Sequence, residues 1–273
     1  MPSAFLNDRG AVRVSGDDAC DFLQGLVTCD MAKVAPGRSA YGALLTPQGK
    51  IIADFIVHEA EGAYWLDCPL ALAPDLAKRL RFYKLRARVE AADVSNETGV
   101  AVVWGSDGVL GETDPRNADL GRRIVGDRAA LAGAHSMDAA PYHAHRISLG
   151  APQGGDDFIY GDTFPHEANL DKLNGVDFRK GCYVGQEVVS RVEHRRTARK
   201  RIVKVELHGG RPEIGAPVYA GGIEIGRMGS SSGDNGLALL RLDRIAEARS
   251  QGAPITCGGV EIFPVAQEAE PAR

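Results

Sequence analysis

The stretch Asp177-Phe178-Arg179-Lys180-Gly181-Cys182-Tyr183-Val184-Gly185-Gln186-Glu187-Val188-Val189-Ser190-Arg191 sets one cysteine among cationic residues and between two glycines. Gly181 and Gly185 both permit a positive φ, as a tight connection into a helix requires. The run from Gln186 to His194 is typical of a short helix. We therefore expect Cys182 to lie near a helix N-terminus.

A thiol at this place experiences positive charge from several sources. Unpaired backbone N–H groups at a helix N-terminus favour the thiolate, and Arg179, Lys180 and Arg191 add full positive charges. Glu187 precedes Arg191 by four residues, so the two side chains can pair along one helix face. The alternative interpretation is a buried structural cysteine beside a glycine turn.

The string Lys180-Gly181-Cys182-Tyr183-Val184-Gly185-Gln186-Glu187 resembles the signature Lys-Gly-Cys-Tyr-x-Gly-Gln-Glu of the YgfZ-type folate-binding proteins. Those proteins assist iron–sulfur cluster assembly and are related to the glycine cleavage T-protein, an aminomethyltransferase. Further blocks similar to the family's occur in the same order along the chain: Val14–Ala19, Phe22–Gly25, Leu45–Lys50, Ala53–Phe55 and Tyr83–Arg86.

The resemblance implies an α+β protein with a three-lobed, aminomethyltransferase-like ring around a central pore where tetrahydrofolate binds. It implies a discontinuous folate-binding domain at residues 1–49 and 139–196. A ferredoxin-like α+β domain is expected at residues 50–138, and a C-terminal β-barrel at residues 197–273.

Hydrophobic patterning, taken alone, also predicts an α+β layer followed by an all-β region. Strands are expected at residues 11–14, 44–45, 51–57, 63–67, 86–91 and 100–104, with helices at 19–26 and 70–83. The short alternating segments 202–207, 216–219, 223–228, 237–242 and 255–265 indicate a small barrel or sandwich. The segment 106–140 is weakly patterned, and the tail 267–273 is typical of disorder.

The composition is that of an ordinary globular protein, with 44% hydrophobic and 25% charged residues in 273 and a formal net charge of -4. No apolar run approaches the roughly 20 residues that span a bilayer, and the first residues lack the regions of a signal peptide. We expect a cytoplasmic monomer without membrane or direct nucleic-acid contacts. The basic run Arg195–Arg201 is expected to be a solvated connection or a contact for the acidic folate tail.

The five cysteines are widely spaced, so we expect free thiols and no disulfide framework or local metal cage: Cys20, Cys29, Cys68, Cys182 and Cys257. The spacing of His143, His145, His166 and His194 matches no standard ligand pattern, and no metal site is predicted.

Asp54 lies in an otherwise apolar strand, where a carboxylate is costly to bury without a partner, so it is a candidate site residue. The alternative is a strand-edge acid facing water. By resemblance, Asp54 would lie next to the folate nitrogens. The T-protein has paired aspartates where this chain has Ala53-Asp54.

The family's pterin-binding glutamate is replaced here by Ser148. A hydroxyl cannot accept two hydrogen bonds from an aminopyrimidine as a carboxylate does. Folate would then bind more weakly, or Glu167 would take over the role. The remaining residues that the resemblance implies near the folate are Lys180, Tyr183, Gln186, Glu187 and Arg191.

The resulting prediction is a tetrahydrofolate-binding accessory protein for the assembly or repair of iron–sulfur enzymes. Cys182 and Asp54 are its candidate reactive residues. By resemblance, its partners are assembly factors or client enzymes, such as radical-dependent tRNA thiolation proteins. Two alternatives stay open at this point: a folate-dependent aminomethyl transferase, and a binding scaffold regulated by folate.

Overall fold

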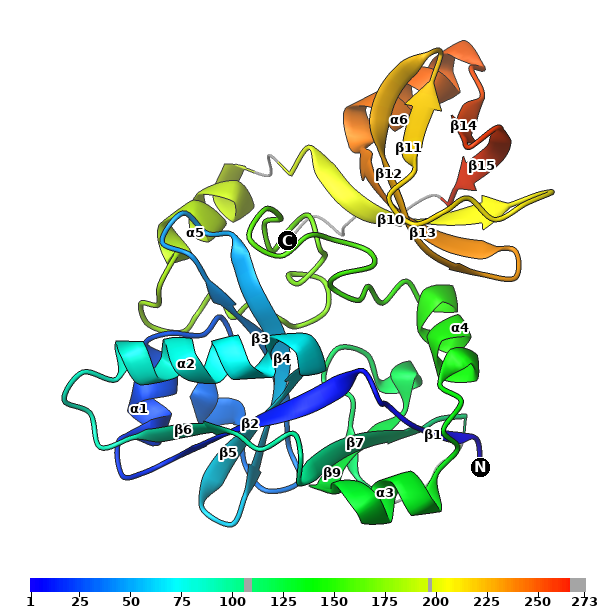
Figure 1. The fold of residues 1–273 in the computed structure, drawn as a ribbon. Helices are drawn as coiled ribbons and strands as arrows, with labels where there is room; N and C mark the ends of the chain where they lie inside the picture. The colour runs from blue at the N-terminus through cyan, green and yellow to red at the C-terminus, as the bar shows by residue number, and fades with distance from the viewer. Residues whose placement is uncertain (106–109, 196–197, 266–273) are drawn as a thin grey trace. The chain divides into compact units, whose positions relative to one another are not determined.

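The computed structural model describes residues 1–105, 110–195 and 198–265, which divide into two compact units (Figure 1). Unit 1 comprises Met1–Tyr142, Tyr160–His166 and Leu170–Arg195. Unit 2 comprises His143–Ile159, Glu167–Asn169 and the described part of Arg196–Arg273. Each unit has a hydrophobic core of its own.

The main sheet of unit 1 has five antiparallel strands in the order β3-β4-β5-β2-β6. The predicted hairpin across Glu61-Gly62 is confirmed, since Ala60 pairs with Ala63 and Ile56 with Asp67. The strands are β2 (Arg9–Ser15), β3 (Ala40–Leu45), β4 (Ile51–Ala60), β5 (Ala63–Pro69) and β6 (Glu90–Asp93). Strand β6 begins later than the strand expected at residues 86–91, because residues 84–88 form turns and bends.

Helix α2 (Ala73–Tyr83) lies along one face of this sheet (Figure 1). Its apolar stripe of Leu76, Ala77 and Leu80 packs into the same core as strand residues such as Val12. The helix begins three residues later than expected because a 3-10 turn, η2 (Leu70–Leu72), precedes it. Helix α1 (Ala19–Gln24) and the 3-10 turn η1 (Met31–Lys33) belong to the same unit.

A second antiparallel sheet of unit 1 has the strand order β1-β7-β9-β8. Its strands are β1 (Ser3–Phe5), β7 (Thr98–Val103), β8 (Glu112–Thr113) and β9 (Arg122–Asp127), accompanied by η3 (Ala118–Leu120) and α3 (Arg128–Ala134). Most of these elements fall in the weakly patterned segment 106–140, of which residues 106–109 lie outside the described residues. Beside the sheet, Trp104 packs against Tyr142 with ring centroids 5.4 Å apart.

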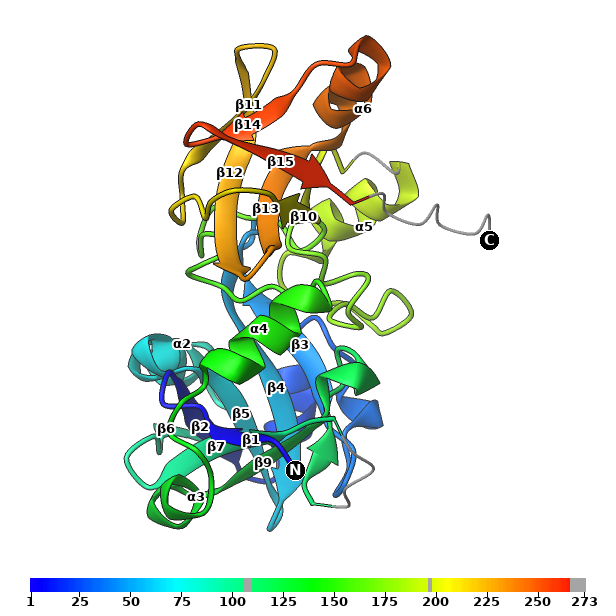
Figure 2. The ribbon, with the colours of Figure 1, turned by 90° about the vertical axis from the view of Figure 1, so that its right-hand side faces the viewer.

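The C-terminal strands of unit 2 close into a barrel in the order β10-β13-β12-β11-β14-β15 (Figure 2), as the regular strand spacing predicted. They are β10 (Lys200–Leu207), β11 (Pro217–Ala220), β12 (Ile223–Ser232), β13 (Asn235–Arg241), β14 (Ile255–Cys257) and β15 (Val260–Pro264). Helix α6 (Leu242–Gln251), which was not predicted, adds Ile245 and Ala248 to the barrel core.

A buried polar clasp ties the segment before the barrel to β12. The Asp157 carboxylate accepts hydrogen bonds from the backbone N and Oγ of Ser230, each at 2.7 Å, and from Arg146 Nη1 at 2.9 Å. Arg146 comes from α4 (Ala140–Ser148), another helix that the pattern did not reveal. Residues 143–159 are therefore part of unit 2.

No helix of the described residues is long and apolar enough to cross a membrane. The tail predicted to be disordered and part of the basic run Arg195–Arg201 lie outside the described residues. The three-domain division with its boundaries stays a prediction.

Candidate functional site

Cys182 is the exposed cysteine of the chain. Cys29, Cys68 and Cys257 are buried, and Cys20 is half-buried. The alternative of a buried structural cysteine is therefore wrong for Cys182. Its thiol can meet a macromolecular partner without unfolding of the protein.

Lys180 fastens the loop that carries Cys182 to the interior. Its ammonium donates hydrogen bonds to the backbone oxygens of Val27 and Cys29, at 2.7 and 2.6 Å, and lies 5.3 Å from the centre of the Tyr183 ring. Burial lowers the pKa of Lys180, although nearby acidic groups oppose the shift. These hydrogen bonds anchor the loop to the interior, and the expected place of Lys180 near folate stays a prediction.

Asp177 holds the start of the same loop. Its Oδ1 accepts hydrogen bonds from the backbone N atoms of Arg179 and Lys180, at 2.8 and 3.1 Å, and its own N donates to the backbone oxygen of Thr28. Burial alone would raise the pKa of Asp177, but its hydrogen bonds to Lys33 and the backbone outweigh burial and lower it. Asp177 and Lys180 thus both fix the loop just before the exposed Cys182 thiol.

The loop enters helix α5 (Gln186–Arg195) through Gly185, which has φ +82°. A Cβ there would lie 2.6 Å from the backbone oxygen of Thr46 and 3.2 Å from Cα of Gly49. The backbones of two turns are therefore in direct contact. Gly181 is different, because its φ is not in the positive range and a Cβ would meet nothing within 4 Å. The expectation of a special conformation is correct for Gly185 and wrong for Gly181.

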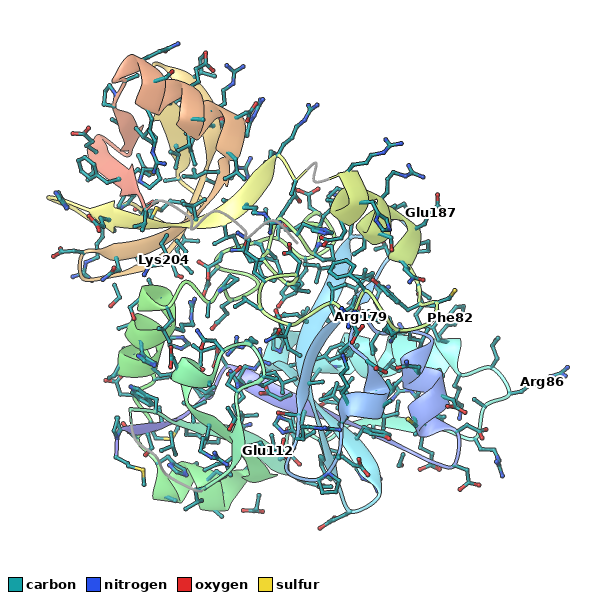
Figure 3. All side chains as sticks on the ribbon, turned by 180° about the vertical axis from the view of Figure 1, so that it is seen from behind. Phe82, Arg86, Glu112, Arg179, Glu187 and Lys204 are labelled. Atoms are coloured by element: carbon teal, nitrogen blue, oxygen red, sulfur yellow. The ribbon has the colours of Figure 1, made fainter. Side chains whose placement is uncertain are left out.

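Helix α5 forms as expected, and Cys182 precedes its first residue by four positions. Glu187 Oε1 accepts a hydrogen bond from Arg191 Nη2 at 2.7 Å, so the predicted pair on one helix face is present. Both side chains are exposed, and Figure 3 shows Glu187 on α5 with Arg179 on the preceding loop. Gln186 is half-buried at the start of the helix.

Tyr183 is buried beside Lys180, and burial raises the pKa of its hydroxyl to about 12. The residue after the exposed cysteine therefore points its ring into the protein.

Asp54 is buried in β4, so the alternative of a water-facing acid is wrong. Its two carboxylate oxygens accept hydrogen bonds from the hydroxyls of Tyr41, at 2.8 Å, and Tyr160, at 2.5 Å. Burial and the neighbouring carboxylate raise the pKa of both tyrosines, which are therefore neutral donors near neutral pH. Two hydroxyl donors, one on each oxygen, hold this buried carboxylate in one orientation.

Tyr41 connects this carboxylate with the loop of the cysteine. A Cβ on Gly175 would lie 2.8 Å from a ring carbon of Tyr41, so the ring packs directly on the Gly175 backbone. The same glycine's carbonyl accepts a hydrogen bond from Thr28 Oγ1 at 2.5 Å. Asp54 and Cys182 thus belong to one unit and are linked through packed residues, one buried and the other exposed.

Glu167 and Ser148 belong to unit 2. The backbone oxygen of Glu167 accepts a hydrogen bond from the backbone N of Ile202 at 2.9 Å. Ser148 Oγ donates to the backbone oxygen of His145 at 2.7 Å, so this hydroxyl is engaged by its own helix. The expected substitution of Glu167 for the family glutamate stays a prediction.

A buried ion network near Asp54 was not foreseen. Asp67 Oδ1 accepts from Arg9 Nε at 2.6 Å and Asp67 Oδ2 from Arg123 Nη1 at 2.5 Å. Arg123 Nε also donates to Asp114 at 2.9 Å, and Asp114 accepts from Arg116 at 2.8 Å. Because the partners are far apart in sequence, the pattern could not show that they meet. The sequence offered one sign of the network, which is an acid, Asp67, within the otherwise apolar strand β5.

The two units match different family models. Residues 6–114 match the GCVT N-terminal domain, and residues 199–271 match the CAF17 C-terminal beta-barrel domain. The iron-sulfur cluster assembly factor IBA57, mitochondrial, of Mus musculus is 34% identical over 88% of this chain and 77% of its own length. The chain belongs to the IBA57 family.

Other members of the IBA57 family support the assignment. The human protein of the same name is 30% identical over 88% of this chain and 77% of its own. The homolog of Mycosarcoma maydis is 35% identical, and the chain spans 56% of that relative's length. The expected aminomethyltransferase-like fold is confirmed, since the glycine cleavage system aminomethyltransferase T from Bartonella henselae superposes with a TM-score of 0.75 over 97% of this chain and 85% of its own, at 15% identity.

Two expectations change with these relatives. The resemblance to YgfZ-type proteins identified the wider aminomethyltransferase-related group, within which the relatives named here are IBA57 proteins. The prediction of a cytoplasmic protein is wrong, since these relatives are named as mitochondrial. That prediction rested on the lack of signal-peptide features and of a membrane-spanning run, and neither feature distinguishes the cytoplasm from an organelle.

Proposed function

We propose that this chain is an accessory factor for iron–sulfur cluster assembly and that Cys182 is its point of contact with the cluster or its carrier. One observation carries the proposal. Cys182 is the exposed member of the chain's five cysteines, and it lies on a loop that hydrogen bonds of Lys180 and Asp177 hold in place. The names of the IBA57 relatives support the biological process.

The chemistry proposed for Cys182 is that of a nucleophile or a transient ligand, with the cluster as cargo. A thiolate is the form that ligates iron or attacks a disulfide. The anchored loop keeps the sulfur at the surface, and the N-terminus of α5 follows within four residues. Arg179 is exposed in the same loop and can attract an acidic partner.

We further propose that tetrahydrofolate binds near Asp54. The Asp54 carboxylate could accept hydrogen bonds from a pterin. Each of its oxygens accepts one bond from a tyrosine hydroxyl and retains capacity for a second, such as one from a pterin N–H. Folate would supply a one-carbon carrier. Within this chain, Asp54 would orient the pterin, and the neutral hydroxyls of Tyr41 and Tyr160 would fix the carboxylate.

The role of the thiol is tested by complementation. Cells lacking their native copy receive the wild-type chain, Cys182→Ser or Cys20→Ser, and the activities of iron–sulfur enzymes are measured, radical-dependent tRNA thiolation among them. We expect Cys182→Ser to fail and Cys20→Ser to restore activity. Full activity with Cys182→Ser would refute the role of the thiol and leave a scaffold regulated by folate.

The second candidate function is a folate-dependent aminomethyl transferase. The observation that favours it is the buried Asp54 in an aminomethyltransferase-like fold. Purified protein would then turn over methylene-tetrahydrofolate, and Asp54→Asn would abolish turnover. Folate binding without turnover would favour the assembly factor.

A further inference from the structure

Three side chains with metal-binding atoms converge in unit 1, and one of them comes from helix α5. They are His166, Asp171 and Glu193, and one ligand atom from each lies within 4.8 Å of the others. His166 Nε2 lies 3.3 Å from Glu193 Oε2. His166 is buried, Asp171 is half-buried and Glu193 is exposed, so the cluster opens toward solvent at one end.

Local structure brings these residues together from two segments. The backbone N of Leu170 donates to the backbone oxygen of Pro165 at 2.9 Å, which closes a tight turn and returns Asp171 toward His166. On α5, Glu193 follows the buried Val189 by four residues, so the two share a helix face. Glu187 and Arg191 form their ion pair on another face of this helix.

The imidazole is positioned more firmly than an exposed histidine would be. The side chain of His166 is 3% exposed, and its ring packs 6.0 Å from the Phe178 ring, at the start of the loop that bears Cys182. A buried imidazole in a packed environment presents Nε2 in a fixed direction. The Glu193 carboxylate, which is 46% exposed, has the freedom to adjust around a bound ion.

We propose that His166, Asp171 and Glu193 bind one divalent first-row transition-metal cation, of the class of Mn²⁺, Fe²⁺ or Zn²⁺. One imidazole nitrogen with two carboxylate oxygens suits these ions, whereas Ca²⁺ and Mg²⁺ prefer oxygen alone. Bond lengths of about 2.0–2.2 Å require the three atoms to move closer together on binding, and the exposed Glu193 side chain has room to turn toward the ion. Three protein ligands leave positions for water, so the ion would be exchangeable.

The alternative is an ordinary ion pair between His166 and Glu193 with no metal ion. The observation that favours a cation site is that Asp171 brings a third ligand atom within 4.8 Å of the other two. Sequence spacing did not reveal this group, since two of its ligands are acids and one comes from a separate helix.

The site is tested with Mn²⁺, whose electron paramagnetic resonance signal falls on binding and which has little affinity for thiols. The titration uses Cys182→Ser protein, so that the proposed function of the thiol does not enter. We expect one equivalent of Mn²⁺ to bind and Zn²⁺ to displace it. Asp171→Asn and Glu193→Gln should each weaken binding by about 10-fold or more.

Glu187→Gln is the matched control, because it removes an exposed carboxylate from the same helix and should leave Mn²⁺ binding unchanged. Circular dichroism of each variant establishes that it is folded. No binding by the Cys182→Ser protein at millimolar Mn²⁺ would overturn the proposal. Equal affinity of Asp171→Asn, Glu193→Gln and their parent would also do so, and an ordinary ion pair would then remain.

Discussion

Cys182 differs from most of the chain's thiols in what surrounds it. Burial raises the pKa of Cys29 and of Cys68 to about 12 each, and burial also raises the pKa of Cys257. These thiols are therefore protonated and shielded near neutral pH, while Cys182 is exposed. Sequence alone could nominate Cys182 by its flanking charges, but it could not show which of five cysteines reach the surface.

The first prediction concerns alkylation. N-ethylmaleimide at pH 8 should modify Cys182 of the native protein well before Cys29, Cys68 and Cys257, because a reactive thiolate must be both formed and accessible. Peptide mass mapping over time gives the rate for each cysteine. Denaturant should make the rates similar, and reaction of Cys29 or Cys68 in the native protein as fast as that of Cys182 would contradict their burial.

The second prediction concerns Asp54. Asp54→Asn keeps the shape of the side chain but removes the charged acceptor of the Tyr41 and Tyr160 hydroxyls, and the new NH₂ group opposes one of these donors. We expect a loss of about 1–3 kcal/mol in the free energy of unfolding. Urea denaturation followed by circular dichroism measures it. The exposed Asp162 is the control, since Asp162→Asn should change stability little.

The turn into helix α5 depends on one glycine. Gly185→Ala should destabilise the protein by more than about 1 kcal/mol, because its φ is +82° and a methyl group would press on the Thr46 carbonyl. Gly181→Ala is the control and should be tolerated. Thermal unfolding and complementation together measure the effect; equal behaviour of the two variants would show that the contact with Gly49 is not needed.

The ion network of Arg9, Asp67, Arg123, Asp114 and Arg116 joins the two sheets of unit 1. Arg123→Met should cost about 3–5 kcal/mol, because it leaves two buried carboxylates without their shared cation. The exposed Arg79, paired with Asp75, is the control, and Arg79→Met should cost little. Equilibrium unfolding in urea distinguishes these outcomes, and a small effect of Arg123→Met would mean that Arg9 and Arg116 compensate.

Elements with strong local patterns were predictable, whereas elements fixed by distant partners were not. The β4–β5 hairpin and α2 have clear alternation or a helical stripe. Strand β9 carries Arg122 and Arg123, and two adjacent arginines are typical of a solvent-exposed segment. Arg123 is nevertheless buried, where it pairs with two carboxylates from other segments. Long-range ion pairs of this kind leave no periodic signal in the sequence.

Acid should unfold the protein through its buried aspartates. Burial alone would raise the pKa values of Asp67 and Asp114, but the arginines around them outweigh burial and lower both. Since the folded-state pKa is depressed, the stabilisation is present above the unfolded-state pKa of about 4 and is lost as the pH falls below it.

We therefore expect the free energy of unfolding to decrease steadily below about pH 4. Unfolding midpoints in urea across pH 2–7 measure this. Asp114→Asn should be less stable than wild type at pH 7, and the difference should shrink as the pH falls. The exposed Asp243→Asn serves as the control with little change, and a constant difference for Asp114→Asn would rule out this carboxylate as a source of acid sensitivity.

The wider aminomethyltransferase-related group could be recognised from contiguous motifs, and the short intervals between the C-terminal strands indicated a barrel or a sandwich, of which the structure has the barrel. The clasp of Arg146, Asp157 and Ser230 depends on residues up to 84 positions apart, and nothing in the pattern pointed to it. The cytoplasmic location was wrong for a different reason, since it was inferred from absent features, whereas the names of the relatives point to mitochondria.

The tryptophans of unit 1 have a practical consequence. The chain has two, Trp65 and Trp104, and both lie in unit 1, the latter packed against Tyr142. Indole fluorescence therefore reports on unit 1 alone, and the barrel gives no emission at wavelengths that excite only indole. A single Phe263→Trp replacement, at a partly exposed ring on β15, would give the barrel its own emission and let the two units be followed separately.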